Sequence, residues 1–177
     1  MPRLLTVRWS ASLVTAVVLS ALLSISQPAQ AHPHQLGGKR SCQTVLGWTE
    51  QTVKSSYIGP ANPIPVQDVG SAAVYYDNIY NAAGMTIGHA VGYVEAIYKR
   101  PSDGHIFTRY HESIELPGGT LADSGTVDRT AMLAGAWVHF NLHGTSGKFL
   151  GASGSRAWQI IPPLSNSTVR LRMTFCP

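Results

Sequence analysis

Short runs in which apolar and polar residues alternate, each ended by turn-forming residues, constrain the fold of this chain most. Alternation with a period of two is typical of strands that bury one face. No window of a dozen residues carries an apolar stripe at helical spacing. The alternating runs predict strands over residues 43–55, 71–80, 85–99, 105–116, 120–128, 136–143, 153–161 and 168–175. Several short strands separated by Gly, Pro, Asn and Asp predict an all-β sandwich or barrel.

The first 31 residues have the layout of a secretory signal peptide. Arg3 and Arg8 precede an apolar stretch over residues 11–25, and Ala29 and Ala31 supply the small residues that the signal peptidase needs. The apolar stretch is shorter than the roughly 20 residues that span a bilayer, so cleavage is favoured over an N-terminal membrane anchor. We therefore expect cleavage after Ala31 and a secreted, extracellular protein with no membrane span after cleavage.

The two cysteines lie at opposite ends of the exported part. Cys42 stands at its start and Cys176 one residue before its end. An even number of cysteines in an exported chain indicates a disulfide, with two buried thiols as the alternative. Such a bond needs both ends at one place, as in a closed barrel, which removes exposed strand edges and leaves room for one small ligand. We expect a flexible leader over residues 32–41 and one barrel domain over residues 42–177.

Charge and composition exclude two classes of protein. Only 12% of the residues are charged and 44% are hydrophobic, which is too apolar for a disordered chain. The formal charge of +4 falls to +2 without Arg3 and Arg8, and no dense basic stripe is present. Because nucleic-acid binders normally carry such a stripe, we expect no nucleic-acid partner.

Motifs for metal, phosphate or hydrolytic chemistry are not supported. His139 and His143 lie four residues apart in a predicted strand, about 13 Å at strand spacing, which is too far to share a metal ion. The sequence His32-Pro33-His34 would bind copper only adventitiously, because Pro33 has no amide proton to lose. Gly147-Lys148 lacks the other residues of a phosphate loop, and no Gly-x-Ser-x-Gly exists. We expect no metal and no cofactor.

A series of glycine-containing motifs over roughly residues 68–160 resembles the allene oxide cyclase and dirigent-protein barrel family. The segments that carry this resemblance are Asp77 to Tyr80, Thr86 to Gly92, Glu115 to Leu121, Asp123 to Gly125 and Leu142 to Gly154. His143 and Ser146 stand where the family usually has glycine. The resemblance implies an eight-stranded antiparallel up-and-down barrel of calycin-like type, often a homodimer or homotrimer. It also implies cofactor-free cyclisation or stereocontrol of reactive small molecules.

Strand alternation and the resemblance together select candidate site residues. Asp77 lies at a family ligand position, and Glu112 interrupts an otherwise apolar strand face. A carboxyl group in an apolar lumen has a raised pKa or is held by donors, and either state suits general acid–base catalysis. We predict Asp77 and Glu112 as the catalytic pair, with Tyr75, Tyr98 and Tyr110 binding the ligand. The alternatives are that a bulge turns Glu112 to solvent and that the tyrosines only pack the core.

Three functions remain open at the level of sequence. The first is an isomerase or cyclase that shapes a small apolar or amphipathic molecule in the lumen. The second is a lipocalin-like carrier that binds such a molecule without converting it, and the third is a cell-surface interaction protein that uses the barrel as a scaffold. Fold alone does not decide among them.

Overall fold

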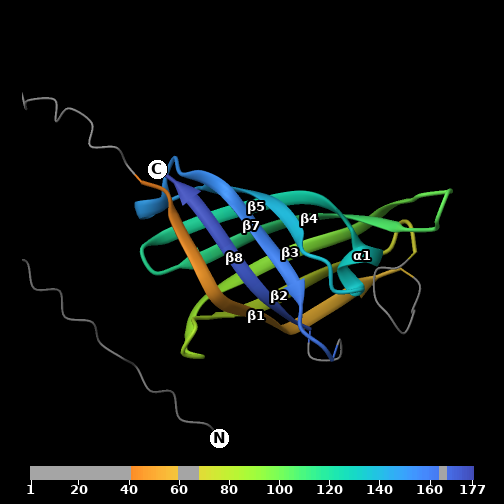
Figure 1. Ribbon diagram of the computed structural model, residues 1–177, viewed down its shortest axis with the longest axis horizontal. Coiled ribbons are helices and arrows are strands. Elements are labelled where there is room, and N and C mark those ends of the chain that lie inside the picture. Colours follow the sequence, from red (N-terminus) through yellow and green to blue (C-terminus); the bar gives the residue numbers. More distant parts are fainter. Residues whose placement is uncertain (1–40, 60–67, 164–166) are drawn as a thin grey trace, which may run out of the picture. The chain divides into compact units, whose positions relative to one another are not determined.

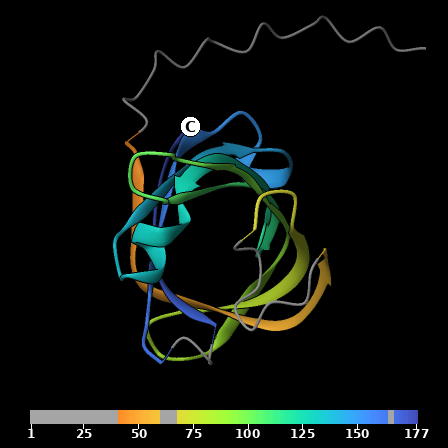
Figure 2. The same cartoon turned by 90° about the vertical axis from the view of Figure 1, so that its right-hand side faces the viewer.

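The computed structural model describes residues 41–59, 68–163 and 167–177, which form a closed antiparallel barrel. The predicted signal peptide and the His32-Pro33-His34 segment lie outside the described residues. The eight strands are β1 (Gln43–Ile58), β2 (Ala72–Tyr80), β3 (Thr86–Lys99), β4 (Ile106–Leu116), β5 (Gly119–Asp128), β6 (Val138–Gly144), β7 (Ser153–Ile160) and β8 (Thr168–Cys176). Each strand pairs with the next, and the ring seen in Figure 2 closes where β1 pairs with β8. The predicted eight-stranded up-and-down barrel is confirmed.

Alternating burial explains why these segments are strands. Along β4, every second side chain from Ile106 to Leu116 is buried in the barrel, whereas Arg109, His111 and Ser113 between them are exposed. Burying one face of a pleated strand removes apolar surface from water at about 25 cal/mol per Å². The period of two in the sequence therefore reflects the alternation of side chains that point into the barrel and side chains that point to solvent.

β-bulges interrupt this alternation in several strands, and one of them overturns a sequence prediction. The pairing of β3 with β4 slips between Ala96 and Tyr98. Beyond the slip, Tyr98 pairs with Phe107, packs against its ring at 5.9 Å and is 48% exposed. The expectation that Tyr98 faces the interior is wrong, because the extra residue of the bulge moves it to the outer wall.

Two short helical segments accompany the strands: the α-helix α1 (Arg129–Leu133) and the 3₁₀ turn η1 (Gly147–Phe149). The Asp128 side chain accepts a hydrogen bond from the Ala131 backbone N–H at 2.9 Å and so caps α1. With five residues, α1 is too short to show a helical stripe in the sequence. Within the described ranges, no helix has the length and apolar character needed to cross a membrane.

The two ends of the described chain are joined. Cys42 and Cys176 form the predicted disulfide, next to the β1–β8 pair Gln43 and Phe175. Figure 1 shows β1 in orange beside β8 in dark blue, with the C-terminus at the start of β1. The disulfide therefore fastens the seam that closes the barrel.

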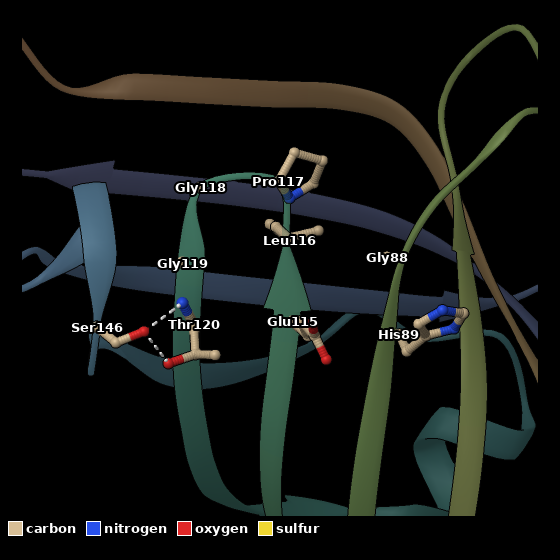
Figure 3. Close-up of a pocket in the computed structure, with 9 residues that line it drawn as sticks. All are labelled: Gly88, His89, Glu115, Leu116, Pro117, Gly118, Gly119, Thr120 and Ser146. Carbon is tan, nitrogen blue, oxygen red and sulfur yellow. Dashed lines mark hydrogen bonds between the residues drawn. The ribbon is translucent and has the colours of Figure 1, made fainter. Parts of the chain in front are cut away.

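A groove of about 510 Å³ lies where β3, the β4–β5 turn and the β6–β7 connection meet. Figure 3 shows the residues around it, which are Gly88, His89, Glu115, Leu116, Pro117, Gly118, Gly119, Thr120 and Ser146. The Ser146 hydroxyl accepts a hydrogen bond from the Thr120 N–H at 3.1 Å and lies 2.7 Å from the Thr120 hydroxyl. These bonds hold the β6–β7 connection against β5.

Candidate functional site

A layer of charged side chains crosses the barrel interior, where an apolar core would be expected. On β4, Glu112 stands between the buried Tyr110 and Ile114, and on β2, Asp77 stands between Tyr75 and the buried Ile79. Buried charges are rare unless they are paired. The partners of these carboxyl groups therefore define the site.

Arg156 on β7 is the centre of the layer. Its guanidinium donates hydrogen bonds to Glu112 on β4, to Asp123 on β5 at 2.5 Å and to Glu50 on β1. All four side chains are fully buried. A guanidinium suits this task because it is planar, remains charged and carries several donors in a fixed fork.

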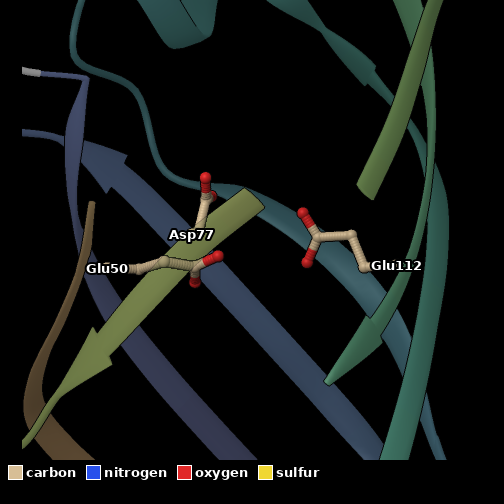
Figure 4. Close-up of side chains that lie close together, drawn as sticks. All are labelled: Glu50, Asp77 and Glu112. Carbon is tan, nitrogen blue, oxygen red and sulfur yellow. The ribbon is translucent and has the colours of Figure 1, made fainter. Parts of the chain in front are cut away.

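Asp77 adds a fourth carboxyl group to the layer. Figure 4 shows the side chains of Glu50, Asp77 and Glu112 converging from β1, β2 and β4. Oxygen atoms of the three groups lie within 4.8 Å of one another. Carboxylate oxygens are ligands for hard cations, so these are the residues that would hold a metal ion if one bound here.

The electrostatics of the layer keep protons on two of its acids. Burial, and secondly the nearby Glu50, raise the pKa of Asp77 to about 8 and that of Asp123 also to about 8. Burial likewise raises the pKa of the Tyr75 hydroxyl well above its usual value. Near neutral pH the layer therefore contains two carboxylic acids that can donate a hydrogen bond or a proton: Asp77, and Asp123, which also accepts a hydrogen bond from Arg156.

Tyr75 reaches the layer across a glycine. Tyr75 on β2, Gly92 on β3 and Glu112 on β4 are successive cross-strand partners. A Cβ atom at Gly92 would overlap the Tyr75 ring, so only glycine lets the ring lie across β3. The Tyr75 hydroxyl then donates a hydrogen bond to Glu112.

Several buried polar atoms of the layer have no hydrogen-bond partner among the described residues. They are Glu50 Oε1, Asp77 Oδ1, Asp123 Oδ1 and Arg156 Nε, together with Thr108 Oγ1 and Trp158 Nε1. Leaving a buried polar atom unpaired costs about 1–3 kcal/mol, and such atoms in a folded protein need an explanation. Their concentration in one interior region distinguishes this part of the barrel from its apolar core.

Aromatic rings lie beside the charged layer. The rings of Tyr110 and Trp158 meet edge to face at 5.3 Å, and Phe140 contacts Trp158 at 4.6 Å. The Arg156 guanidinium lies 4.7 Å from the centre of the Trp158 ring. The Tyr110 hydroxyl accepts a hydrogen bond from Arg129 of α1 at 2.9 Å. These rings offer a flat apolar surface next to the polar groups.

The structure brings together four of the five side chains that the sequence selected. Asp77, Glu112, Tyr75 and Tyr110 lie in or beside the layer, whereas Tyr98 does not. Sequence reasoning missed Glu50, Asp123 and Arg156. Alternation could have found two of them, because Asp123 shares a face with Leu121 and Arg156 shares one with Trp158. Glu50 gave no such signal, because β1 contains two register shifts.

The fold is a closed eight-stranded barrel, a class of small barrels whose interior is either filled by side chains or holds one small ligand. The family model of the allene oxide cyclase barrel like domain matches residues 49–172, and the chain belongs to this family. A comparison with curated proteins finds no match.

Solved structures agree with this assignment. One is a protein described as a nonspecific heme-binding cyclase that catalyzes [4 + 2] cycloaddition during neoabyssomicin biosynthesis; it is 29% identical, with a TM-score of 0.69, over 78% of this chain and 68% of that one. A second, AbnU, is described as an exo-specific intermolecular Diels-Alderase and is 26% identical, with a TM-score of 0.68, over 79% of this chain and 100% of that one. The pterocarpan synthase dirigent protein PsPTS1 is 10% identical, with a TM-score of 0.58, over 79% of this chain and 96% of that one, and shares the fold.

Proposed function

We propose that this protein binds a small molecule inside the barrel and promotes its cyclisation without a cofactor. The observation that carries the proposal is the buried acid Asp77, which has an unpartnered Oδ1 and lies in a layer of four carboxyl groups around one guanidinium. The cycloaddition cyclases that resemble this chain at 26–29% identity support the reaction class.

The chemistry of such a site is electrostatic. A hydrogen bond from the neutral Asp77 carboxyl to a carbonyl oxygen of an unsaturated ligand draws electron density from the conjugated double bonds. This makes them more reactive toward a second π system. In an intramolecular cyclisation the new carbon–carbon bonds form from the ligand's own π electrons, so the product has the mass of the substrate. Asp77 keeps its proton at the end of the cycle.

The aromatic rings supply the positioning. The Tyr110 ring and the rings of Phe140 and Trp158 form a rigid surface against which the apolar part of the ligand packs. Holding two reacting π systems in contact removes much of the entropic barrier to their reaction. The proposed substrate is therefore amphipathic, with a polar end at the charged layer and an unsaturated apolar body.

The test uses the ligand that co-purifies with the protein from its natural host, identified by native mass spectrometry. The precursor of that ligand is incubated with the wild type and with Asp77→Asn, and the products are separated by liquid chromatography with mass detection. We expect conversion to a product of equal mass and different retention time, slowed about 10²–10⁴-fold in Asp77→Asn with little change in binding. Recovery of every bound ligand unchanged would instead identify the lipocalin-like carrier.

A further inference from the structure

A row of hydrogen-bonding side chains crosses the outer wall of the barrel. Asn78 on β2, His89 on β3, Glu115 on β4 and Thr120 on β5 are successive cross-strand partners and form this polar row. His89, Glu115 and Thr120 also line the groove of about 510 Å³ that Figure 3 shows. We propose that the polar row and its groove bind a neutral oligosaccharide, at a site separate from the barrel interior.

Burial of the neighbouring residues places the polar row on the outer wall. The residues next to its members in the chain, Ile79, Ala90, Ile114 and Leu121, are all 0% exposed, so the row faces the other way. With strands about 4.8 Å apart, four strands give the row a length of about 14 Å. The groove volume lies within the range of about 300–1,000 Å³ that is typical of small-molecule sites. The site therefore has room for a few linked sugar rings.

Hydrogen bonds within the wall hold the polar row in place. Asn78 Nδ2 donates to the Tyr80 hydroxyl at 3.3 Å, so Asn78 Oδ1 is the acceptor that faces His89 Nδ1 at 3.1 Å. The proton of the neutral imidazole then lies on Nδ1, and Nε2 is an acceptor. At the other end of the row, the Thr120 hydroxyl lies 2.7 Å from that of Ser146. Side chains that are already fixed lose less freedom when a ligand binds.

The charges at the groove favour a ligand that is uncharged and rich in hydroxyl groups. The Glu115 carboxylate has no hydrogen bond or ion pair with another described residue. Because its oxygens only accept, the ligand must supply donors, and bonds to a charged acceptor are the stronger ones. Lys148 packs on the same turn, since a Cβ atom at Gly118 would come within 2.8 Å of its Cδ. One carboxylate and one ammonium favour neither an anion nor a cation, whereas sugar hydroxyls both donate and accept.

Aromatic and aliphatic side chains beside the polar row offer an apolar face. The rings of Tyr76 and His89 stack with their centres 5.2 Å apart and their planes inclined by 29°. Both side chains are partly exposed, and Val91, the cross-strand partner of Tyr76, is 57% exposed. A sugar ring carries C–H groups on its faces and hydroxyls around its edge. A wall with rings beside hydrogen-bonding groups contacts both parts of such a ligand.

Probes of similar length and different charge test the inference. The neutral probes are cellohexaose, maltohexaose, mannohexaose and hexa-N-acetylchitohexaose, and the charged probes are hexagalacturonate and hexalysine. Their binding to the secreted protein, with its disulfide intact, is measured by titration calorimetry at pH 7. We expect at least one neutral hexasaccharide to bind more tightly than hexalysine. Hexagalacturonate should bind about tenfold more weakly or not at all, because its carboxylates oppose Glu115.

Variants locate the binding. Glu115→Gln should weaken binding of the neutral hexasaccharide about tenfold or more, which is the effect of losing a hydrogen bond to a charged group. Tyr76→Ala should weaken it and Tyr76→Phe should not, with circular dichroism confirming that each variant is folded. Glu95→Gln is the matched control, because Glu95 lies opposite Arg109 on the outer wall and outside the groove. Conversion of the proposed cyclisation substrate should be the same in Glu115→Gln as in the wild type.

The inference is overturned if no neutral hexasaccharide binds, if hexagalacturonate or hexalysine binds most tightly, or if Glu115→Gln retains wild-type affinity. Self-association that Glu115→Arg abolishes, measured by analytical ultracentrifugation, would assign the groove to a second copy of this chain and also overturn it. Co-sedimentation with the matching insoluble polysaccharide distinguishes two sources of the ligand. Pelleting with the polymer supports a surface polysaccharide, and binding of the hexasaccharide alone supports a free oligosaccharide.

Discussion

At the scale of single residues, the barrel depends on Arg156. It brings together carboxyl groups of three other strands, and its burial is complete. Removing one partner of a buried ion pair typically costs 3–5 kcal/mol, because the remaining charge stays buried. Burial, and secondly the nearby Glu50, raise the pKa of Asp77 and that of Asp123 to about 8, so both stay protonated near neutral pH. The protonation states of Asp77 and Asp123 therefore differ between the folded and the unfolded protein.

This linkage predicts how stability depends on pH. The pKa values of Asp77 and Asp123 rise from 3.8 to about 8 on folding, so the folded state holds more protons than the unfolded state between about pH 4 and pH 8. Stability contributed by these groups is complete below pH 4 and is lost as the pH rises through 8. We expect the melting temperature, measured by circular dichroism from pH 5 to pH 9, to fall with pH and then level off.

Two variants check the assignment of that effect. Asp77→Asn and Asp123→Asn should each flatten the decline, because an amide does not titrate. Glu95→Gln on the outer wall should keep the wild-type slope. A melting temperature that rises across this range would contradict the protonated state of both acids.

At the scale of the strands, the site depends on a position of β3, Gly92, that has no side chain. Three neighbouring strands place Tyr75, Gly92 and Glu112 side by side. The Tyr75 ring occupies the space that a side chain at position 92 would fill. The hydroxyl of Tyr75 then reaches Glu112 and orients it. A glycine in the interior of a strand weakens the strand, so its presence here has a packing reason.

Gly92→Ala should therefore disturb the site through Tyr75. Its Cβ would displace the ring, and overpacking of this kind costs about 1–3 kcal/mol in the free energy of unfolding, measured with urea. Combining Gly92→Ala with Tyr75→Ala should cost less than the sum of the two single changes, because the second change removes the clash. Val91→Ala, on the outer wall of the same strand, should stay within about 0.5 kcal/mol. Strict additivity of the first pair would show that the glycine does not make room for Tyr75.

At the scale of the whole barrel, closure and the disulfide act on the same seam. Cys42 and Cys176 are separated by 134 residues in the sequence. In the chain-entropy model, closing so long a loop stabilises the fold by about 4–5 kcal/mol. Such a bond persists in an oxidising compartment, in agreement with the predicted signal peptide.

Export gives a prediction for the mature protein. Because Ala29 and Ala31 suit the signal peptidase, protein recovered from the culture medium should begin at His32 by N-terminal sequencing. Thiol labelling before reduction should find no free cysteine, and labelling after reduction should find two. Recovery of the complete chain from Met1 in the medium, or two reactive thiols in unreduced material, would contradict export through this segment.

The strands, their number and the disulfide could be predicted from the sequence, because each follows from local alternation or from a simple count of cysteines. The sequence also placed Asp77, Glu112, Tyr75 and Tyr110 on inner faces, because a period of two fixes the face of a residue wherever the strand is regular. Other features of the site depend on how the strands pair in three dimensions. A bulge moved Tyr98 to the outer wall, and register shifts in β1 hid the inward position of Glu50. The convergence of Glu50, Glu112 and Asp123 on Arg156 depends on the closed barrel, which brings distant strands within hydrogen-bond distance across the interior. Alternation predicts whether a side chain points into the barrel or out of it. Which side chains meet across the interior depends on strand register and on barrel closure.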